Sequence, residues 1–106
     1  MNSIIETNFR QTKHGLEKKL IYSGIGSIYI GMGLDINIYN FYIKPEKRGK
    51  GYGSKLLDQA ILVALRENKN IFLSCTNVGY SWKSKFYERH GFKNLGGKDN
   101  LFMYDR

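Results

Sequence analysis

Polar and apolar residues alternate through most of the first 43 positions of the chain, with the period of two that is typical of β-strands. Polar groups at residues 13–15 and 33–35 interrupt this pattern and predict turns. Four segments rich in β-branched and aromatic residues lie between the interruptions: residues 3–10, 16–22, 26–32 and 36–43. Because strands joined by short turns pair antiparallel, the first half of the chain predicts an antiparallel meander.

The fourth of these segments has two different faces. Successive side chains of a strand point to opposite sides of the sheet, so Ile36, Ile38 and Tyr42 are expected on one side. The other side is expected to carry the remaining residues of the alternation, which are Asn37, Tyr39, Phe41 and Ile43.

After residue 53 the period changes to that of a helix with one apolar face. Apolar residues recur there at helical spacing: Leu56, Leu57, Ala60, Ile61, Ala64 and Leu65. This helix should end near residues 68–70, where polar residues replace the pattern. The apolar run at residues 71–75 follows as a short buried strand, and a strand–helix–strand unit of this length predicts parallel pairing through a right-handed crossover.

The last third of the sequence predicts a second helix and two closing strands. Ser81 is suited to cap this helix and Gly91 to end it. Strands are expected near residues 92–96 and 100–105. We therefore predict an α+β fold, in which an antiparallel meander is followed by strand–helix–strand–helix and two closing strands of one mixed sheet.

The composition fits one small globular domain over residues 1–106, with a formal charge of +8 and 42% hydrophobic residues. Cys75 is the single cysteine, which excludes an intrachain disulfide and a cysteine cluster, and we expect no metal site. The sequence contains no secretory signal and no apolar run near the ~20 residues of a membrane span. We therefore expect a cytoplasmic protein with no membrane partner. The positive charge suits an anionic partner, which by charge alone could be nucleic acid, anionic lipid, an acidic protein or a phosphorylated cofactor.

The positive charge is concentrated at a turn between the fourth strand and the first helix. Gly49, Gly51 and Gly53 alternate there, surrounded by five basic residues: Lys44, Lys47, Arg48, Lys50 and Lys55. Such a turn exposes the amide N–H groups of the first helical turn, and glycines let a phosphate approach them closely. A Walker loop would end in Gly-Lys-Ser/Thr, but here Ser54 precedes Lys55. A dinucleotide fingerprint would have a third glycine in the region that Lys55 and Leu56 occupy. We interpret the turn as a site for a different phosphate-bearing cofactor.

Two segments resemble motifs of the GCN5-related N-acetyltransferase (GNAT) superfamily. Arg48-Gly49-Lys50-Gly51-Tyr52-Gly53 matches the family pattern R/Q-x-x-G-x-G/A, and residues 85–93 (KFYERHGFK) resemble its later FYE-x-x-GF segment. The resemblance spans about residues 26–105. It implies the acyl-CoA N-acyltransferase fold, with acetyl-CoA as cosubstrate and no metal.

The resemblance also implies where the cosubstrate binds. In that family coenzyme A lies where the sheet opens between the strand before the turn and the strand after the first helix, here residues 36–43 and 71–75. Backbone groups near Phe41 and Ile43 are expected to bind the pantetheine arm. Tyr87 matches the tyrosine that faces the sulfur, where it is expected to stabilise or protonate the leaving thiolate. The diphosphate is expected on the amides of Arg48, Gly49, Lys50, Gly51, Tyr52, Gly53 and Ser54.

The resemblance does not identify the base that deprotonates the acceptor amine. Members that acetylate histones place a glutamate on the strand before the turn, where this chain has Asn37. Asp35, two residues earlier on the same face, is the candidate substitute, and Glu6 and His14 are remoter ones. His90 is expected as a solvent-facing helix end.

The front of the chain departs most from the family. Most members insert two helices between their first and second strands as a wall of the acceptor pocket, whereas only about residues 11–15 separate those strands here. The acceptor side should therefore be open to a protein or another macromolecule, or be completed by a partner such as a second copy of the chain. The resemblance implies an N-acetyltransferase acting on a primary amine. A non-catalytic module that binds coenzyme A or a protein, and a basic nucleic-acid-binding module, are alternatives left open.

Overall fold

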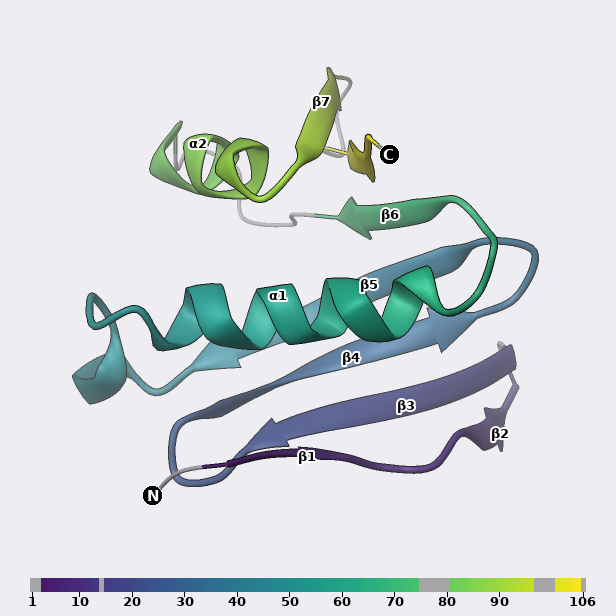
Figure 1. The fold of residues 1–106 in the computed structure, drawn as a ribbon, viewed down its shortest axis with the longest axis horizontal. Coiled ribbons are helices and arrows are strands. Elements are labelled where there is room, and N and C mark those ends of the chain that lie inside the picture. Colours follow the sequence, from purple (N-terminus) through teal and green to yellow (C-terminus); the bar gives the residue numbers. More distant parts are fainter. Residues whose placement is uncertain (1–2, 14, 75–80, 97–100, 106) are drawn as a thin grey trace.

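The computed structural model describes residues 3–13, 15–74, 81–96 and 101–105. Its elements are β1 (Ile4–Glu6), β2 (Arg10–Thr12), β3 (Gly15–Tyr22), β4 (Gly26–Met32), β5 (Ile36–Ile43), the 3-10 helix η1 (Pro45–Lys47), α1 (Tyr52–Leu65), β6 (Ile71–Ser74), α2 (Ser81–Arg89), β7 (Phe92–Gly96) and β8 (Leu101–Tyr104). Figure 1 shows α1 lying along β3–β5, with α2, β7 and the C-terminus beyond β6. The predicted bounds of β4 and β5 are confirmed, and the two closing strands are confirmed as β7 and β8.

The strands form one sheet in the order β1-β3-β4-β5-β6-β8-β7, with β2 also paired to β3. All pairs are antiparallel except β5 with β6, which is parallel. The meander, the parallel unit and the α+β class are therefore confirmed. The first predicted strand is wrong as a single element, because residues 7–9 separate β1 from β2. There the Thr7 hydroxyl accepts a bond from the Lys19 amide at 2.9 Å, and side-chain bonds of this kind compete with a strand ladder.

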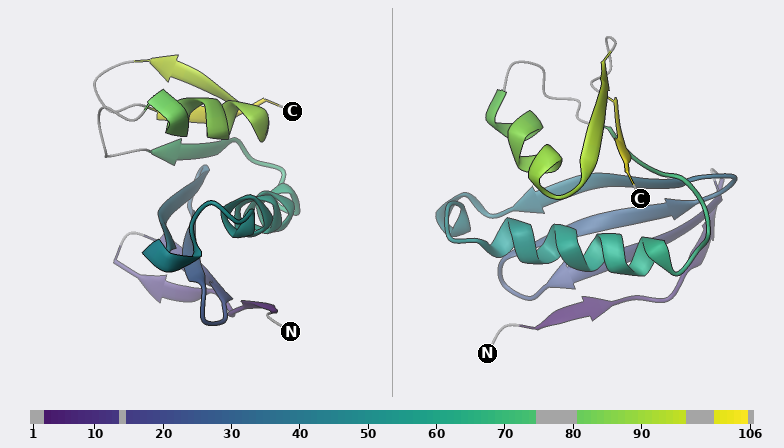
Figure 2. Two further views of the ribbon diagram at one scale, coloured as in Figure 1. Left: turned by 90° about the vertical axis from the view of Figure 1, so that its left-hand side faces the viewer. Right: turned by 45° about the horizontal axis from the view of Figure 1, so that its top comes forward.

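Both helices pack on the same face of the sheet. Ile36 and Ile38 of β5 are in register with Ile71 and Leu73 of β6, and all four side chains are buried on the side that α1 covers. Burying each large apolar side chain favours folding by about 1.5–3 kcal/mol. Among the described residues no helix covers the opposite face, and Figure 2 shows α1 on one side of the strands only. The residues that α1 buries are Leu56, Leu57, Ala60, Ile61, Val63 and Ala64.

A β-bulge in β5 changes the face on which its last residues lie. The register of β5 on β4 shifts between Tyr39 and Tyr42, so that Asn40 and Phe41 together stand opposite one residue of β4. Asn40 has a φ of +50°, a region that asparagine enters more readily than most residues. The predicted alternation is therefore wrong beyond Tyr39: Phe41 and Ile43 pack against the core, and Tyr42 is 49% exposed.

The helix ends deviate from the prediction by a few residues. α1 ends at Leu65, before the predicted end near residues 68–70. Ser81 is already helical, so the cap of α2 precedes it and lies outside the described residues, as does Cys75. Gly91 follows α2 with a φ of +97°, which confirms the predicted stop. In the described ranges, neither helix is both long and apolar enough to cross a membrane.

Candidate functional site

The turn between β5 and α1 bends at two glycines in the left-handed region. Gly49 has a φ of +76°, and Gly51, the N-cap of α1, has a φ of +86°. A side chain in this region destabilises the backbone by about 1–2 kcal/mol, which explains the residue type. A Cβ atom at either position would meet no other atom within 4 Å. The turn is therefore open on the side toward which these glycines would point a side chain.

The amide groups of this turn form a run of unpaired donors. The Arg48 amide donates to the Pro45 carbonyl at 3.3 Å, and the helical ladder begins with the Lys55 amide, which donates to Gly51 at 3.3 Å. No side chain caps α1. Unpaired donors at the positive end of a helix dipole are suited to a phosphate group. The N–H groups between these two bonds donate to no acceptor in the described part of the chain; they belong to Gly49, Lys50, Gly51, Tyr52, Gly53 and Ser54.

Gly53, the third glycine of the turn, lies at a packed position. It lies inside α1, where a Cβ would be 3.4 Å from Cζ of Phe41 and 3.8 Å from Cζ of Phe86. The rings of Phe41 and Phe86 stack with their centroids 6.3 Å apart. These are ordinary van der Waals distances, so Gly53 lies where α1 packs on β5 and α2, and a methyl group would fit there.

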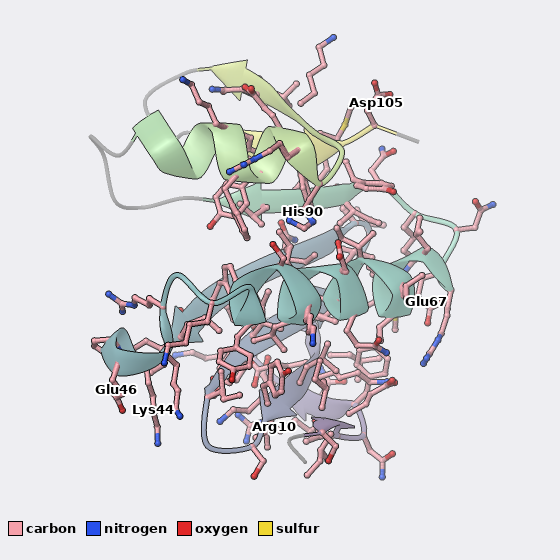
Figure 3. The ribbon with its side chains drawn as sticks, turned by 60° about the vertical axis from the view of Figure 1, so that its left-hand side comes forward. Arg10, Lys44, Glu46, Glu67, His90 and Asp105 are labelled. Atoms are coloured by element: carbon pink, nitrogen blue, oxygen red, sulfur yellow. The ribbon has the colours of Figure 1, made fainter. Side chains whose placement is uncertain are left out.

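The basic side chains around the turn are held to different degrees. Arg48 Nε donates to the Ile43 carbonyl at 2.9 Å, and its guanidinium carbon lies 5.9 Å from the centroid of the Tyr42 ring. Lys44 and Lys50 are exposed, and Figure 3 shows Lys44 beside Glu46 at the η1 end of the molecule. The Arg48 side chain is therefore anchored to the end of β5, with further positive charge around the amides.

The described pairing of β5 with β6 is short and ends before the part of β5 that leads into this turn. The parallel ladder joins residues 36–38 of β5 to residues 71–73 of β6 and extends no further among the described residues. β5 continues to Ile43, at the end where α1 begins. We call the place beside residues 39–43 of β5, beyond the described ladder, the opening; the side chains of Phe41 and Ile43 lie on its helix side. Residues 75–80 lie outside the described residues, so the separation of the two strands at this place stays a prediction.

Tyr87 lies on α2 with its ring in the core. The side chain is 6% exposed, and its centroid is 5.3 Å from that of Phe102 and 6.4 Å from that of Phe92. Its neighbour Phe86 meets it edge-on at 5.6 Å and stacks on Phe41 across the opening. These contacts fix the orientation of the Tyr87 ring, next to the place where Phe41 of β5 stacks on Phe86 of α2.

The candidate bases do not gather at the opening. Asp35 precedes β5, while the described ladder ends at Ile38, about 10 Å further along the strand at ~3.3 Å per residue. Glu6 pairs with Lys18 at 2.5 Å and with Arg66 at 2.9 Å, beyond the C-terminal end of α1. The hydrogen bond from Lys18, supported by Arg66, holds the pKa of Glu6 below its usual value. His14 lies outside the described residues.

His90 lies beside the start of α1, a position that the sequence did not reveal. The expectation of a solvent-facing helix end is wrong, because the side chain is only 13% exposed and lies between the two helices, as Figure 3 shows. Its Nδ1 is 2.6 Å from Asp58 Oδ1, and its Nε2 is 3.1 Å from Ser54 Oγ. The i, i+4 spacing of Ser54 and Asp58 places them on one face of α1, but only the fold brings His90 to them.

A second polar cluster lies on the face of the sheet without helices. The Tyr39 hydroxyl donates to Glu17, and Arg10 donates to the same carboxylate at 2.8 Å. Burial, aided by the carboxylate, raises the pKa of Tyr39 to about 12. The Tyr39 hydroxyl and Arg10 lower the pKa of Glu17. Gly31 makes room for the Tyr39 ring, since a Cβ there would be 3.1 Å from Tyr39 Cε1.

Solved structures with a similar fold include two N-acetyltransferases and an anti-CRISPR protein. The PaiA N-acetyltransferase of Thermoplasma acidophilum in complex with coenzyme A has a TM-score of 0.65 and 22% identity, over 85% of this chain and 60% of that chain. The ribosomal-protein-S18-alanine N-acetyltransferase of Escherichia coli has a TM-score of 0.73 and 15% identity, over 97% and 91% of the two chains. The anti-CRISPR protein AcrVA5 has a TM-score of 0.66 and 21% identity, over 84% and 98%. At these identities the similarity shows the fold.

The family is shown by the sequence match. The chain spans 60% of the length of the Thermoplasma enzyme, and no curated protein matches it. The model of the acetyltransferase (GNAT) domain matches residues 13–94, which include the glycine turn, the opening and α2. The chain therefore belongs to the GNAT acetyltransferase family.

Proposed function

We propose that this chain is an N-acetyltransferase that moves the acetyl group of acetyl-CoA to a primary amine. The observation that carries the proposal is the run of unpaired amides from Gly49 to Ser54, beside the opening. Family membership supports a coenzyme A thioester as the acyl donor, and the Thermoplasma neighbour was solved with coenzyme A.

In this proposal the diphosphate is bound mainly by the backbone. The donors are the amides of residues 49–54, and each charge-assisted hydrogen bond contributes about 1.5–3 kcal/mol. Since the Arg48 amide is already paired, Arg48 contributes through the charge of its side chain, together with Lys50. The amide-rich pantetheine arm adds to β5 near Phe41 and Ile43, where the edge of the strand has no partner among the described residues, as an extended peptide adds to a sheet.

The chemical step is direct attack on the thioester. The amine nitrogen bonds to the carbonyl carbon, the C–S bond breaks, and its electron pair stays on sulfur. The proton that the nitrogen loses passes to water, so the products are an amide and the thiolate of coenzyme A or its protonated thiol. A phenol of pKa ~10 is a weaker acid than a thiol of pKa ~8.5, so full proton transfer is uphill by ~1.5 units, or about 2 kcal/mol. Tyr87 therefore acts mainly through a hydrogen bond that strengthens as the thiolate charge develops.

The acceptor that suits this chain best is an amine of low pKa on a protein or another macromolecule. At pH 7 a lysine of pKa ~10.4 is neutral in about one molecule in a few thousand, whereas an α-amino group of pKa ~7.7–8.0 is neutral in roughly one in ten. Asp35 lies too far along β5 to receive the proton directly, so its role as base would need water. The E. coli neighbour acts on an alanine of a ribosomal protein.

Gly51→Glu tests the binding site. A carboxylate above the amides repels the diphosphate, so calorimetry should show at least a tenfold loss of acetyl-CoA affinity, about 1.4 kcal/mol. Gly96→Glu is the matched control, because Gly96 has a φ of +77° and open space around it but lies in β7. Equal losses in both variants, or no binding to the unmodified chain, would contradict the proposal.

Tyr87→Phe tests the leaving-group role. Loss of a hydrogen bond made in the transition state should lower kcat about 10²-fold while leaving the Kd of coenzyme A within about twofold. The Phe ring preserves the packing on Phe102 and Phe92. An unchanged kcat would remove Tyr87 from the mechanism.

A non-catalytic module that binds coenzyme A is the second candidate. The 6% exposure of Tyr87 and the position of Asp35 favour it. Incubation of the protein with radiolabelled acetyl-CoA in a cell extract separates the two. A labelled acceptor that disappears with Gly51→Glu supports the transferase, whereas saturable binding without any labelled product supports the module.

A further inference from the structure

His90 connects α2 to the first two turns of α1 through both of its ring nitrogens. Nδ1 lies 2.6 Å from Asp58 Oδ1, and Nε2 lies 3.1 Å from Ser54 Oγ. The ring also packs on Phe86, with the centroids 4.8 Å apart. Asp58 is the charged group that faces the ring from α1, and Phe86 faces it from α2. The imidazole is therefore held in one orientation by both helices.

The protons of this group follow from its partners. A carboxylate only accepts hydrogen bonds, so the Nδ1 that faces Asp58 carries a hydrogen in either charge state of the ring. In the neutral ring Nε2 is then an acceptor, and the Ser54 hydroxyl donates to it. In the imidazolium Nε2 also donates, Ser54 Oγ accepts, and the hydroxyl hydrogen is released toward another acceptor.

Ser54 also contributes an amide to the run of donors at the start of α1. We propose that His90 is a positioning residue of the diphosphate site, whose protonation turns the Ser54 hydroxyl outward as an additional donor and adds a positive charge beside the diphosphate. This inference rests on the proposed function. Because linkage is reciprocal, a ligand that favours the imidazolium takes up a proton on binding and binds more tightly as the pH falls.

The ligand for the test is dephospho-CoA. The 3′-phosphate of coenzyme A is a monoester, which titrates near pH 6 and would obscure the result. Dephospho-CoA keeps the diphosphate diester, which does not titrate in this range. Its Kd, measured by calorimetry, should tighten about three- to tenfold as the pH falls from 8 to 6. Titrations in two buffers of different ionisation enthalpy should show net proton uptake.

Three variants separate the role of His90 from simpler explanations. His90→Gln cannot titrate, so its Kd should be independent of pH across this range. His14→Gln removes the other histidine of the chain and should keep the full pH dependence. Ser54→Ala retains the charge of His90 but lacks the hydroxyl, so its pH dependence should be clearly smaller than that of the unmodified protein. Thermal unfolding of each variant verifies that it is folded.

The outcomes also distinguish this inference from the proposed function. Binding of dephospho-CoA that is independent of pH, or a full pH dependence in His90→Gln or Ser54→Ala, overturns the role of His90 and leaves the diphosphate site in place. Absence of binding at every pH overturns the site itself, and the inference with it. A pH dependence that His90→Gln abolishes and Ser54→Ala reduces supports the coupling.

Discussion

At the scale of single residues, Tyr39 joins β5 to β3 across the face without helices. Its hydroxyl donates to Glu17 and is the largest cause of the lowered pKa of that carboxyl group. Tyr39→Phe should lower the free energy of unfolding by about 1.5–3 kcal/mol at pH 7, because a hydrogen bond to a charged group is lost. Urea unfolding measures this. Tyr42→Phe, at an exposed tyrosine of the same strand, is the control and should change little.

The two pKa shifts of this pair predict how stability depends on pH. Glu17 has a lowered pKa in the folded state, so its contribution is present above its usual value of 4.5 and is lost as the pH falls through the folded pKa. Tyr39 has a pKa raised from 10.0 to about 12, so its contribution is present below pH 10 and is lost as the pH rises toward 12. The difference in unfolding free energy between the unmodified protein and Tyr39→Phe should therefore shrink at both extremes. A constant difference from pH 3 to pH 11.5 would contradict both shifts.

The sequence predicted best those residues whose conformation depends on their neighbours along the chain. Gly49 and Gly51 stand at a turn where the strand pattern meets the helix pattern, and their positive φ angles follow from that junction. His90 and Tyr39 depend on partners far along the chain, at separations of 36 and 22 residues. No local pattern indicates such contacts, so both side chains were missed or misplaced.

At the scale of elements, the bulge at Asn40 decides which side chains line the opening. It places Phe41 on the helix face, where it stacks on Phe86, and leaves Tyr42 exposed. Asn40→Val should destabilise the fold by about 1–2 kcal/mol, because a β-branched residue is strained at a φ of +50°. Asn40→Gly adopts this angle freely and is the matched control. Thermal unfolding compares the two, and equal midpoints would show that the bulge is not held by the conformation of this residue.

The bulge also shows why the elements were easier to predict than their faces. The bounds of β4 and β5 follow from alternation interrupted by turns, which is a local property. The bulge inserts one residue into a ladder, and its position depends on how β5 pairs with β4. A strict period of two therefore fails after Tyr39, although every residue of the strand was assigned correctly.

At the scale of the whole molecule, the fold consists of two parts joined across the opening. One part comprises β1–β5 with α1, and the other comprises β6–β8 with α2; Figure 2 shows α2 and β7 standing away from the strands that α1 covers. The parts share one apolar core, in which α1 covers Ile71 and Leu73 of β6. They are also joined by the short parallel ladder of residues 36–38 with 71–73, by the stack of Phe41 on Phe86, and by the bridge from His90 to α1. Under the proposed function, coenzyme A would bind where these joints end and would contact both parts.

This arrangement predicts that the second part opens more readily than the first. Amide hydrogen exchange should show β7 and β8 exchanging at a lower free energy than β3 and β4, because fewer joints must break. Coenzyme A at 100 times its Kd should raise the free energy of unfolding by about 2.7 kcal/mol and slow amide exchange in β7 and β8 up to about 100-fold. Gly51→Glu should lose this protection and Gly96→Glu should keep it. Equal protection of all four strands without ligand would mean that the two parts unfold together, and a ligand effect confined to α1 would mean that the cofactor does not join them.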